Sequence, residues 1–229
     1  MSLACFISPG KDFATAVARV KAAEDVGYEM VLTTTTTGRD GLMTLAAYAA
    51  GTSKIKLATG VLPALPRHPL SLGIQAATLD ELSGGRLVLG IGPSHKISME
   101  GFYGIELTKP AARMREYVQI LRSLFTTNAV SFEGEFYKAQ WTFVGYGARK
   151  DLPIYIAAMA PEMLRLCGEL CDGDVLWACL PTFIRESVTP TIHAAAKGAG
   201  RDPSEVKIVA AIPTALTTNP DAARALYRA

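Results

Sequence analysis

The sequence of 229 residues lacks the features that mark several large classes of protein. Its 23 lysine and arginine residues nearly balance its 21 aspartate and glutamate residues, and no basic or acidic run is long enough to form a tail. The longest charge-free windows, such as 41–53 and 208–220, reach 13 residues, which is fewer than the roughly 18 that a membrane-spanning helix needs. We therefore expect neither a nucleic-acid partner nor a membrane partner.

Several catalytic and metal-binding motifs are also missing. The sequence contains no phosphate-binding P-loop, no H-E-x-x-H zinc motif and no G-x-S-x-G nucleophile motif. It has four cysteines, which are Cys5, Cys167, Cys171 and Cys179. They show no C-x-x-C spacing and no neighbouring histidine, so we expect buried thiols and no metal site. The start of the chain lacks the positively charged segment of a signal peptide, and we expect a reducing, cytoplasmic location.

Apolar residues make up 49% of the chain, which is enough for a large core and excludes intrinsic disorder. Strand-like apolar runs alternate with runs of helical spacing. We expect strands at 3–8, 30–34, 55–61, 87–91, 153–158, 175–178 and 206–216. We expect helices at 12–26, 42–50, 75–82, 113–125, 161–171, 185–199 and 221–229. Asp12 and Gly27 are suitable caps for the first helix, and Pro161 suits the first turn of another.

The strands are nearly continuous runs of valine, isoleucine, leucine and alanine, as expected for a parallel sheet that is covered on both faces. Seven β/α units of this kind fit either an open doubly wound sheet or a TIM-type (β/α)8 barrel. Seven strands would leave two unpaired edges in a barrel. The barrel interpretation therefore implies that the last β/α unit is missing from this chain. The alternating segment 130–143, around Glu133-Gly134, predicts a hairpin.

The segment 87–96, LVLGIGPSHK, gives the strongest indication of a site. A strand runs into Gly90 and Gly92, which let the backbone approach a flat ligand because they have no Cβ. Ser94 and His95 follow, where the carboxyl end of a barrel strand places its active-site loop. The third glycine of a dinucleotide fingerprint would fall at His95, and we expect no helix to begin there. The alternative is a glycine-rich turn with a surface histidine.

The segment 58–69, ATGVLPALPRHP, is another strand end with a glycine, followed by three prolines that stiffen the loop. The Gly60-Val61 peptide is a candidate for a strained or cis bond beneath a ring. Arg67 and His68 either contact an anionic ligand or support the loop.

Two further strand ends carry weaker signals. Five consecutive threonines at 33–37 either continue a strand or offer hydroxyl groups at a barrel mouth. At 157–162, AAMAPE, a strand joins a helix whose first backbone N–H groups can hold a phosphate, although every such loop offers this in principle.

These segments occur together with three longer motifs, which are TLDELSGGRLVLGIG at 78–92, RMREYVQIL at 113–121 and VSFEGEFY at 130–137. In this combination the chain resembles the luciferase-like monooxygenase family along its whole length. Within the family it most resembles the oxidoreductases that depend on coenzyme F420, a deazaflavin, and FMN is the alternative cofactor. The resemblance implies a single luciferase-like barrel domain over 1–229, C-terminally incomplete, with 130–143 as an insertion near the mouth.

The resemblance also implies a cofactor site at the carboxyl ends of the strands. The ring would lie on a bulged, non-prolyl cis peptide after the third strand and beside the turn after the fourth, with the phosphate end on the loop after the fifth. The implied cofactor-binding residues are Thr35, Thr36, Gly60, Val61, Gly92, Pro93, Ser94, Ala158, Met159 and Ala160.

Thr35 and Thr36 stand where many relatives carry an acidic residue and a histidine, so the usual proton donor is replaced. His95 is the remaining candidate catalytic residue, because an imidazole titrates near pH 6.5. The leading expectation is an oxidoreductase that moves a hydride between a deazaflavin and a small organic substrate. An FMN-dependent monooxygenase and a non-catalytic flavin-binding barrel are the alternatives. Relatives pair through barrel helices, so a homodimer is expected, and the weakly polar helix at 42–50 suits an interface.

Overall fold

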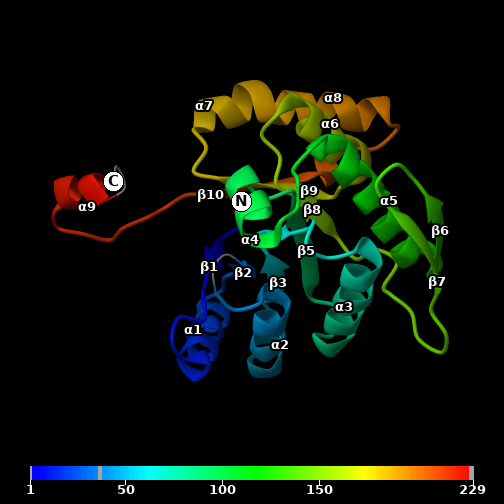
Figure 1. Cartoon of the computed structure of the whole chain (residues 1–229). Helices are drawn as coiled ribbons and strands as arrows, with labels where there is room; N and C mark the ends of the chain where they lie inside the picture. Colours follow the sequence, from blue (N-terminus) through cyan, green and yellow to red (C-terminus); the bar gives the residue numbers. More distant parts are fainter. Residues whose placement is uncertain (1, 36–37, 227–229) are drawn as a thin grey trace.

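A computed structural model describes residues 2–35 and 38–226 and arranges them around a parallel sheet (Figure 1). Seven strands follow one another along this sheet, and they are β1 (Ala4–Phe6), β2 (Met30–Thr33), β3 (Lys56–Thr59), β5 (Leu87–Gly92), β8 (Ile154–Ile156), β9 (Gly173–Trp177) and β10 (Lys207–Ala211). The short strand β4 (Leu62–Pro63) also pairs with β5. A doubly wound sheet reverses its strand order at a switch point, whereas this order never reverses. The predicted α/β fold of the TIM-barrel type is therefore confirmed.

Helices connect the strands and cover the outer face of the sheet, whereas α9 follows the last strand and lies apart from the sheet (Figure 1). They are α1 (Phe13–Asp25), α2 (Gly41–Gly51), α3 (Pro69–Leu82), α4 (Lys96–Tyr103), α5 (Pro110–Thr127), α6 (Pro161–Leu170), α7 (Pro181–Phe183), α8 (Thr189–Gly198) and α9 (Pro220–Leu226), with a π-helix (Ile184–Val188) and a 3-10 helix (Pro203–Glu205). Asp12, Asp40 and His68 accept hydrogen bonds from the first N–H groups of α1, α2 and α3. Such caps fix where a helix begins because these N–H groups have no partner inside the helix. None of the described helices combines the length and the apolar character that crossing a bilayer requires.

The two faces of the sheet carry separate hydrophobic clusters. The smaller cluster contains no helical residue and fills the inner, concave face; its buried members are Leu32, Ala58, Val88, Tyr155 and Val175. The larger cluster joins the outer face to the helices and includes Leu57, Leu89, Ile154 and Leu176. Successive residues of a strand point to opposite faces. The apolar runs of the sequence are continuous because each strand supplies both clusters.

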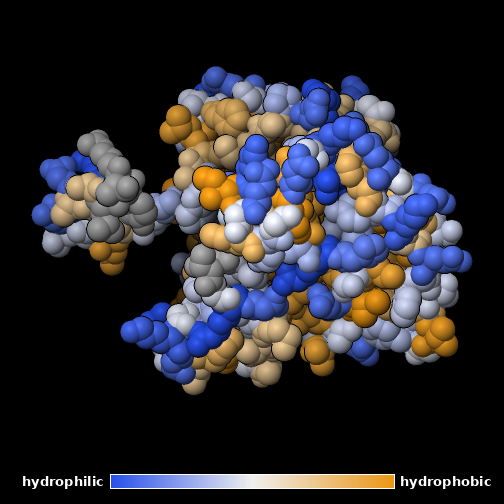
Figure 2. Space-filling model, in the orientation of Figure 1, coloured by the Kyte–Doolittle hydropathy of each residue, from blue (hydrophilic) through white to orange (hydrophobic). Residues whose placement is uncertain are grey.

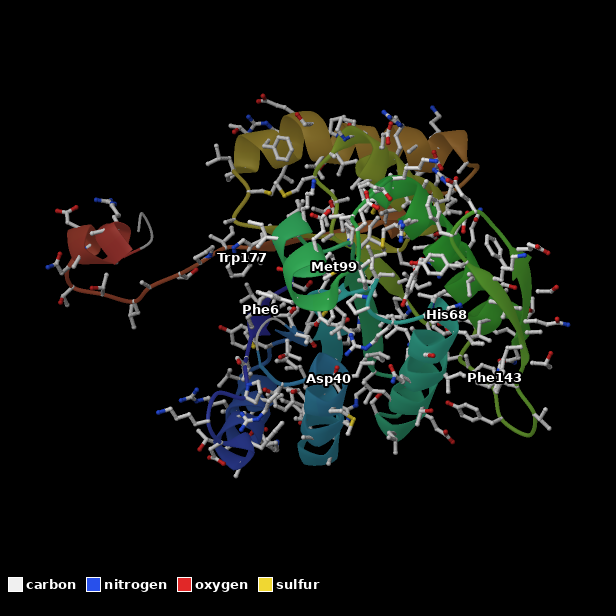
Figure 3. All side chains as sticks on the ribbon, viewed as in Figure 1. Phe6, Asp40, His68, Met99, Phe143 and Trp177 are labelled. Carbon is white, nitrogen blue, oxygen red and sulfur yellow. The ribbon has the colours of Figure 1, made fainter. Side chains whose placement is uncertain are left out.

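The sheet curls around its inner face. Phe6 at the end of β1 and Trp177 at the end of β9 lie next to each other, with ring centroids 5.8 Å apart and planes at 85° (Figure 3). β1 is one edge of the sheet and β9 is next to the other edge, so this contact spans the mouth of the barrel. Among the described strands, β1 and β10 each pair with one neighbour, and they do not pair with each other.

Charged side chains fix the amino-terminal ends of the strands. Asp80 is 3% exposed, accepts the N–H of Leu87 at the start of β5 and forms an ion pair with Arg149. Arg86 donates to the backbone oxygen atoms of Ala49 in the last turn of α2 and of Thr52 and Ile55 on the connection to β3. The motif TLDELSGGRLVLGIG therefore anchors β5 at one end and shapes the mouth at the other.

The predicted hairpin at 130–143 is confirmed as the antiparallel pair β6 (Ala129–Glu133) and β7 (Lys138–Thr142). Its turn is held by Glu116 of α5. The two carboxylate oxygens of Glu116 accept the N–H groups of Glu135, Phe136 and Tyr137 at 2.7–3.0 Å. The motifs RMREYVQIL and VSFEGEFY occur together because the first supplies the carboxylate that the second encloses.

The structure corrects the sequence prediction at two helices. We expected no helix at His95, but α4 begins at Lys96 with His95 as its N-cap residue. Met99 is the one residue that α4 buries, so the segment lacked the apolar spacing by which helices were recognised. α3 begins at Pro69 and not near residue 75, because His68 caps it and a proline suits the first turn.

Candidate functional site

The inner face of the sheet has little side-chain volume at the mouth. The inner cluster includes Ala58, Val88 and Tyr155, so the residues two positions further along each strand face the same side. These are Gly60, Gly90 and Ala157. The strands therefore end in a shelf formed by backbone and methyl groups, as the sequence analysis predicted for a flat ligand.

A bulge interrupts the third strand at this shelf. Ala58 pairs with Val88, and the next pair is Leu62 with Ile91. Three residues, 59–61, therefore lie opposite two residues of β5, 89–90, so the β3–β4 segment contains one residue more than β5. The Gly60-Val61 peptide within the bulge is cis. The bulged, non-prolyl cis peptide that the family resemblance implied is thus confirmed.

Thr59 and Gly90 meet where the ladder is interrupted. The hydroxyl of Thr59 donates to the Gly90 carbonyl at 2.6 Å and accepts the Gly90 N–H at 2.8 Å, so both backbone groups of Gly90 are paired. A Cβ at position 90 would lie 2.0 Å from the Thr59 carbonyl oxygen. Glycine is required here by the backbone itself.

The other two glycines of the shelf are also enclosed by the protein. A Cβ at Gly60 would lie 2.7 Å from both the Phe6 and Leu32 side chains. A Cβ at Gly92 would lie 3.1 Å from Val61 and 3.3 Å from Ala157. Phe6 and Leu32 therefore fill the inner side of Gly60, and Val61 and Ala157 lie beside Gly92.

The turn after β5 brings four predicted residues together. Gly92 is buried, and Pro93 and Ser94 are half-buried. Ser94 has φ of 68°, in the left-handed region that non-glycine residues rarely adopt. His95 is exposed and its side chain makes no capping hydrogen bond, so its imidazole is available at the mouth.

The loop after β8 leads into the start of α6. The cap residue Ala160 has no side-chain hydrogen bond, and Pro161 occupies the first turn. The first N–H groups of α6 are therefore available, together with the positive end of its dipole. Met159 is exposed, whereas the Ala158 N–H is already bonded to Asp174.

Asp174 was not predicted from the sequence. It lies in β9 with 0% exposure, its Oδ1 accepts the Ala158 N–H at 2.9 Å, and its Oδ2 has no partner among the described residues. Burial raises the pKa of this carboxyl to about 7, although its hydrogen bonds with Ala158 and Val175 lower it in part. The loop after β8 thus rests on a carboxyl group that readily keeps its proton.

The threonine run at the end of β2 makes internal hydrogen bonds. The Thr34 hydroxyl donates to the Val61 carbonyl at 2.5 Å, and the Thr35 hydroxyl accepts the Gly41 N–H at 2.7 Å. Thr36, also predicted to bind the cofactor, lies outside the described residues. The run therefore ties β2 to the bulge and to the start of α2.

Arg67 and His68 support their loop, which was one of the two roles open to them. Arg67 forms an ion pair with Asp40. His68 caps α3 through Nδ1, and its Nε2 lies 3.2 Å from the Lys138 carbonyl oxygen.

The cysteines are less uniformly buried than expected. Cys167 and Cys171 are buried, whereas Cys5 and Cys179 are half-buried, and all four are free thiols. Burial raises the pKa of Cys171 to about 12, which keeps it protonated and unreactive at neutral pH.

Comparison with known proteins identifies the family of this chain. A family model described as luciferase-like monooxygenase matches residues 2–229. The chain belongs to the luciferase-like monooxygenase family. The motifs at 78–92, 113–121 and 130–137 are therefore family motifs, and the structure places them at the shelf, on α5 and on the hairpin.

Several relatives of this luciferase-like chain carry F420 in their names. A Mycobacterium tuberculosis protein named as a coenzyme F420-dependent oxidoreductase is 36% identical over 177 residues, covering 72% of this chain and 50% of the relative. A 5,10-methylenetetrahydromethanopterin reductase of Archaeoglobus fulgidus is 35% identical over 206 residues, covering 90% of this chain and 61% of the relative. The chain spans between 50% and 61% of the length of these two relatives.

Solved structures share the fold. The coenzyme F420-dependent tetrahydromethanopterin reductase of Methanopyrus kandleri superposes with a TM-score of 0.78 at 28% identity, covering 91% of this chain and 65% of that chain. An F420-dependent secondary alcohol dehydrogenase superposes with a TM-score of 0.82 over 91% of this chain and 68% of that chain. Its identity of 20% shows likeness of fold alone.

Proposed function

We propose that this luciferase-like chain is an F420-dependent oxidoreductase that transfers a hydride between the deazaflavin and a small organic substrate. One observation carries the proposal: a glycine-containing bulge at Gly60-Val61 faces Gly92 across a shelf at the carboxyl ends of the strands. Its support from relatives is the 35–36% identity to proteins whose names include F420 or a reductase activity.

The residues present fit a flat ring with a phosphate tail. The ring would lie on Gly60 and Val61 and beside Gly92, Pro93 and Ser94, where two glycines keep side-chain volume small. Its anionic end would lie at Met159 and Ala160, where the first N–H groups of α6 are available. The Ala158 backbone would shape this loop and leave its N–H with Asp174. Thr35 would border the same site from the loop after β2. When bound, the deazaflavin supplies the hydride chemistry.

In this proposal His95 holds or donates a proton at its imidazole. It is exposed at the mouth and free of capping hydrogen bonds. We expect His95→Ala to lower turnover by about 100-fold, the usual contribution of general acid–base catalysis, while F420 affinity changes little. Turnover that is unchanged in His95→Ala would remove this residue from the role.

The cofactor is tested by titrating the protein separately with F420 and FMN while Trp emission is recorded. Trp177 contacts Phe6, and Phe6 packs against Gly60, so a ring on the bulge should quench Trp177. Trp177→Phe leaves Trp141 on the β6–β7 hairpin and serves as the control. We expect F420 to bind more tightly than FMN, and binding of neither cofactor contradicts the proposal.

Two alternatives keep specific support. An FMN-dependent monooxygenase is favoured by the description of the family, and tighter binding of FMN with oxygen consumption would establish it. A non-catalytic flavin-binding barrel is favoured by threonines at the positions of the acidic residue and histidine. Tight cofactor binding without hydride transfer to any member of a substrate panel would establish that alternative.

We further propose a homodimer through α2 and a reducing, cytoplasmic location. α2 contains no charged residue, Met43 on it is 70% exposed, and the surface over α2 is apolar in Figure 2. The four free thiols support a reducing location. Light scattering should give twice the mass of the chain, and Met43→Glu should halve it.

A further inference from the structure

Two threonine hydroxyl groups hold the β3–β4 bulge from opposite sides. Thr34 at the end of β2 donates to the Val61 carbonyl at 2.5 Å. Thr59 at the end of β3 bonds both backbone groups of Gly90 on β5. The three strands β2, β3 and β5 are neighbours in the sheet, so the bulge is fastened to the strand on each side.

The bulge requires such side-chain partners because it interrupts the ladder. Backbone pairing between β3 and β5 stops after Ala58 and Val88 and resumes at Leu62 and Ile91. In that interval the Gly90 N–H and carbonyl would face no backbone partner across the strand. Thr59 is 1% exposed, so water does not replace its hydroxyl, and the side chain completes the ladder.

Both hydroxyl groups act on the surface on which the ring is proposed to lie. The carbonyl that Thr34 fixes belongs to Val61, whose side chain would also lie 3.1 Å from a Cβ at Gly92. The carbonyl of Thr59 passes so close to Gly90 that no Cβ fits between them. A shift of either strand therefore moves the Val61 and Gly92 backbone that forms the shelf.

We propose that Thr34 and Thr59 are positioning residues, which set the height and tilt of the shelf for the deazaflavin ring. This inference rests on the proposed function and adds to it residues that touch neither the ring nor the substrate. It also gives the threonine run a role: Thr34 fastens the bulge and Thr35 fastens the start of α2. The run then serves to build the shelf, in place of supplying a proton.

The test compares the F420 affinity of the original chain with that of three variants, each of which changes one buried threonine. Thr59→Val keeps the shape and removes the hydroxyl, whereas Thr59→Ser keeps the hydroxyl. Thr44→Val is the matched control, because Thr44 is equally buried and donates within α2 to Asp40. We expect Thr59→Val to weaken binding by about tenfold or more, since small displacements of a positioned surface have effects of that size. Thr59→Ser and Thr44→Val should stay within about threefold of the original chain.

Hydrogen exchange of the cofactor-free protein gives a second readout. The Gly90 amide is held by Thr59, so its exchange should accelerate in Thr59→Val and not in Thr44→Val. If Thr59→Val does not fold, Thr34→Val replaces it, because Thr34 is half-buried and bonds one carbonyl only. Absence of F420 binding by the original chain overturns the proposed function. Binding by the original chain with unchanged affinity in a folded Thr59→Val or Thr34→Val overturns this inference alone.

Discussion

At the scale of single residues, the proton of Asp174 affects the stability of the fold. Burial raises the pKa of this carboxyl from 3.8 to about 7, whereas in the unfolded chain it stays near 3.8. Between these values the folded state holds a proton that the unfolded state has lost. The contribution of Asp174 to the free energy of unfolding is therefore complete below about pH 4, falls as the pH rises to about 7 and is lost above that. The loss amounts to roughly 4 kcal/mol.

Asp174→Asn should remove this pH dependence, because asparagine keeps an oxygen for the Ala158 N–H and carries no charge. Urea unfolding at pH 5 and pH 8 measures the difference. We expect the original chain to lose roughly 3 kcal/mol between the two pH values relative to Asp174→Asn. Asp221→Asn on exposed α9 is the control and should follow the original chain. Parallel curves for the original chain and Asp174→Asn would refute the assignment.

Gly90 and Gly101 provide a matched pair of glycine substitutions. A Cβ at Gly90 would lie 2.0 Å from the Thr59 carbonyl, whereas nothing lies within 4 Å of one at Gly101 in α4. We expect Gly90→Ala to lower the free energy of unfolding by about 3 kcal/mol or more, and Gly101→Ala to raise it by about 0.5 kcal/mol through helix propensity. Thermal unfolding of both variants checks the sign, and equal effects would be inconsistent with the close contact at Gly90.

The residues of the site were predictable to different degrees. Gly60 lies near the end of a strand-like run and Gly92 and His95 follow another, so their places at the mouth could be inferred from the sequence. The roles of Thr34, Thr59 and Asp174 could not be inferred in this way. Each depends on a hydrogen bond to another strand or loop, and the bulge sets which atoms meet.

At the scale of elements, the hairpin is fixed to α5 through one carboxylate. Glu116 accepts three backbone N–H groups from the β6–β7 turn, and a Cβ at Gly134 would lie 2.4 Å from it. Glu116→Ala would leave these N–H groups without their partner, so we expect a loss of about 2–3 kcal/mol in the free energy of unfolding. Limited proteolysis should then cut first in the turn. Glu133→Gln, in an exposed ion pair with Lys138, should change neither result.

Helix boundaries show why sequence patterns located some elements and missed others. The start of α1 was found because Asp12 caps it and apolar residues follow at helical spacing. The sequence predicted a helix from residue 185, but helical structure already begins at Pro181. It then passes through a π-helical turn before it reaches Pro190 in α8. A proline lacks the N–H and displaces the carbonyl of the preceding turn, and a π turn accommodates both. Propensity alone does not show that the helix continues through such a residue.

At the scale of the whole molecule, β1 and β10 present unpaired edges within the described chain. Lys207 donates towards β9, so by alternation the N–H groups of Ile208 and Ala210 point to the open side. Open edges pair with other strands. We expect the mass from light scattering to rise above that of a dimer with concentration. Ala210→Pro should suppress this rise and Ala210→Ser should not, while a mass independent of concentration would contradict the prediction.

The contact between Phe6 and Trp177 has a consequence for the aperture of the mouth. In a closed barrel, continuous hydrogen bonds between neighbouring strands set the radius, and widening it means breaking them. Here two rings meeting edge to face span the opening between β1 and β9. Such a ring pair involves no backbone hydrogen bond, so side-chain packing alone joins β1 to β9 at this point. A guest that displaces the two rings would therefore leave the backbone ladder of each strand intact.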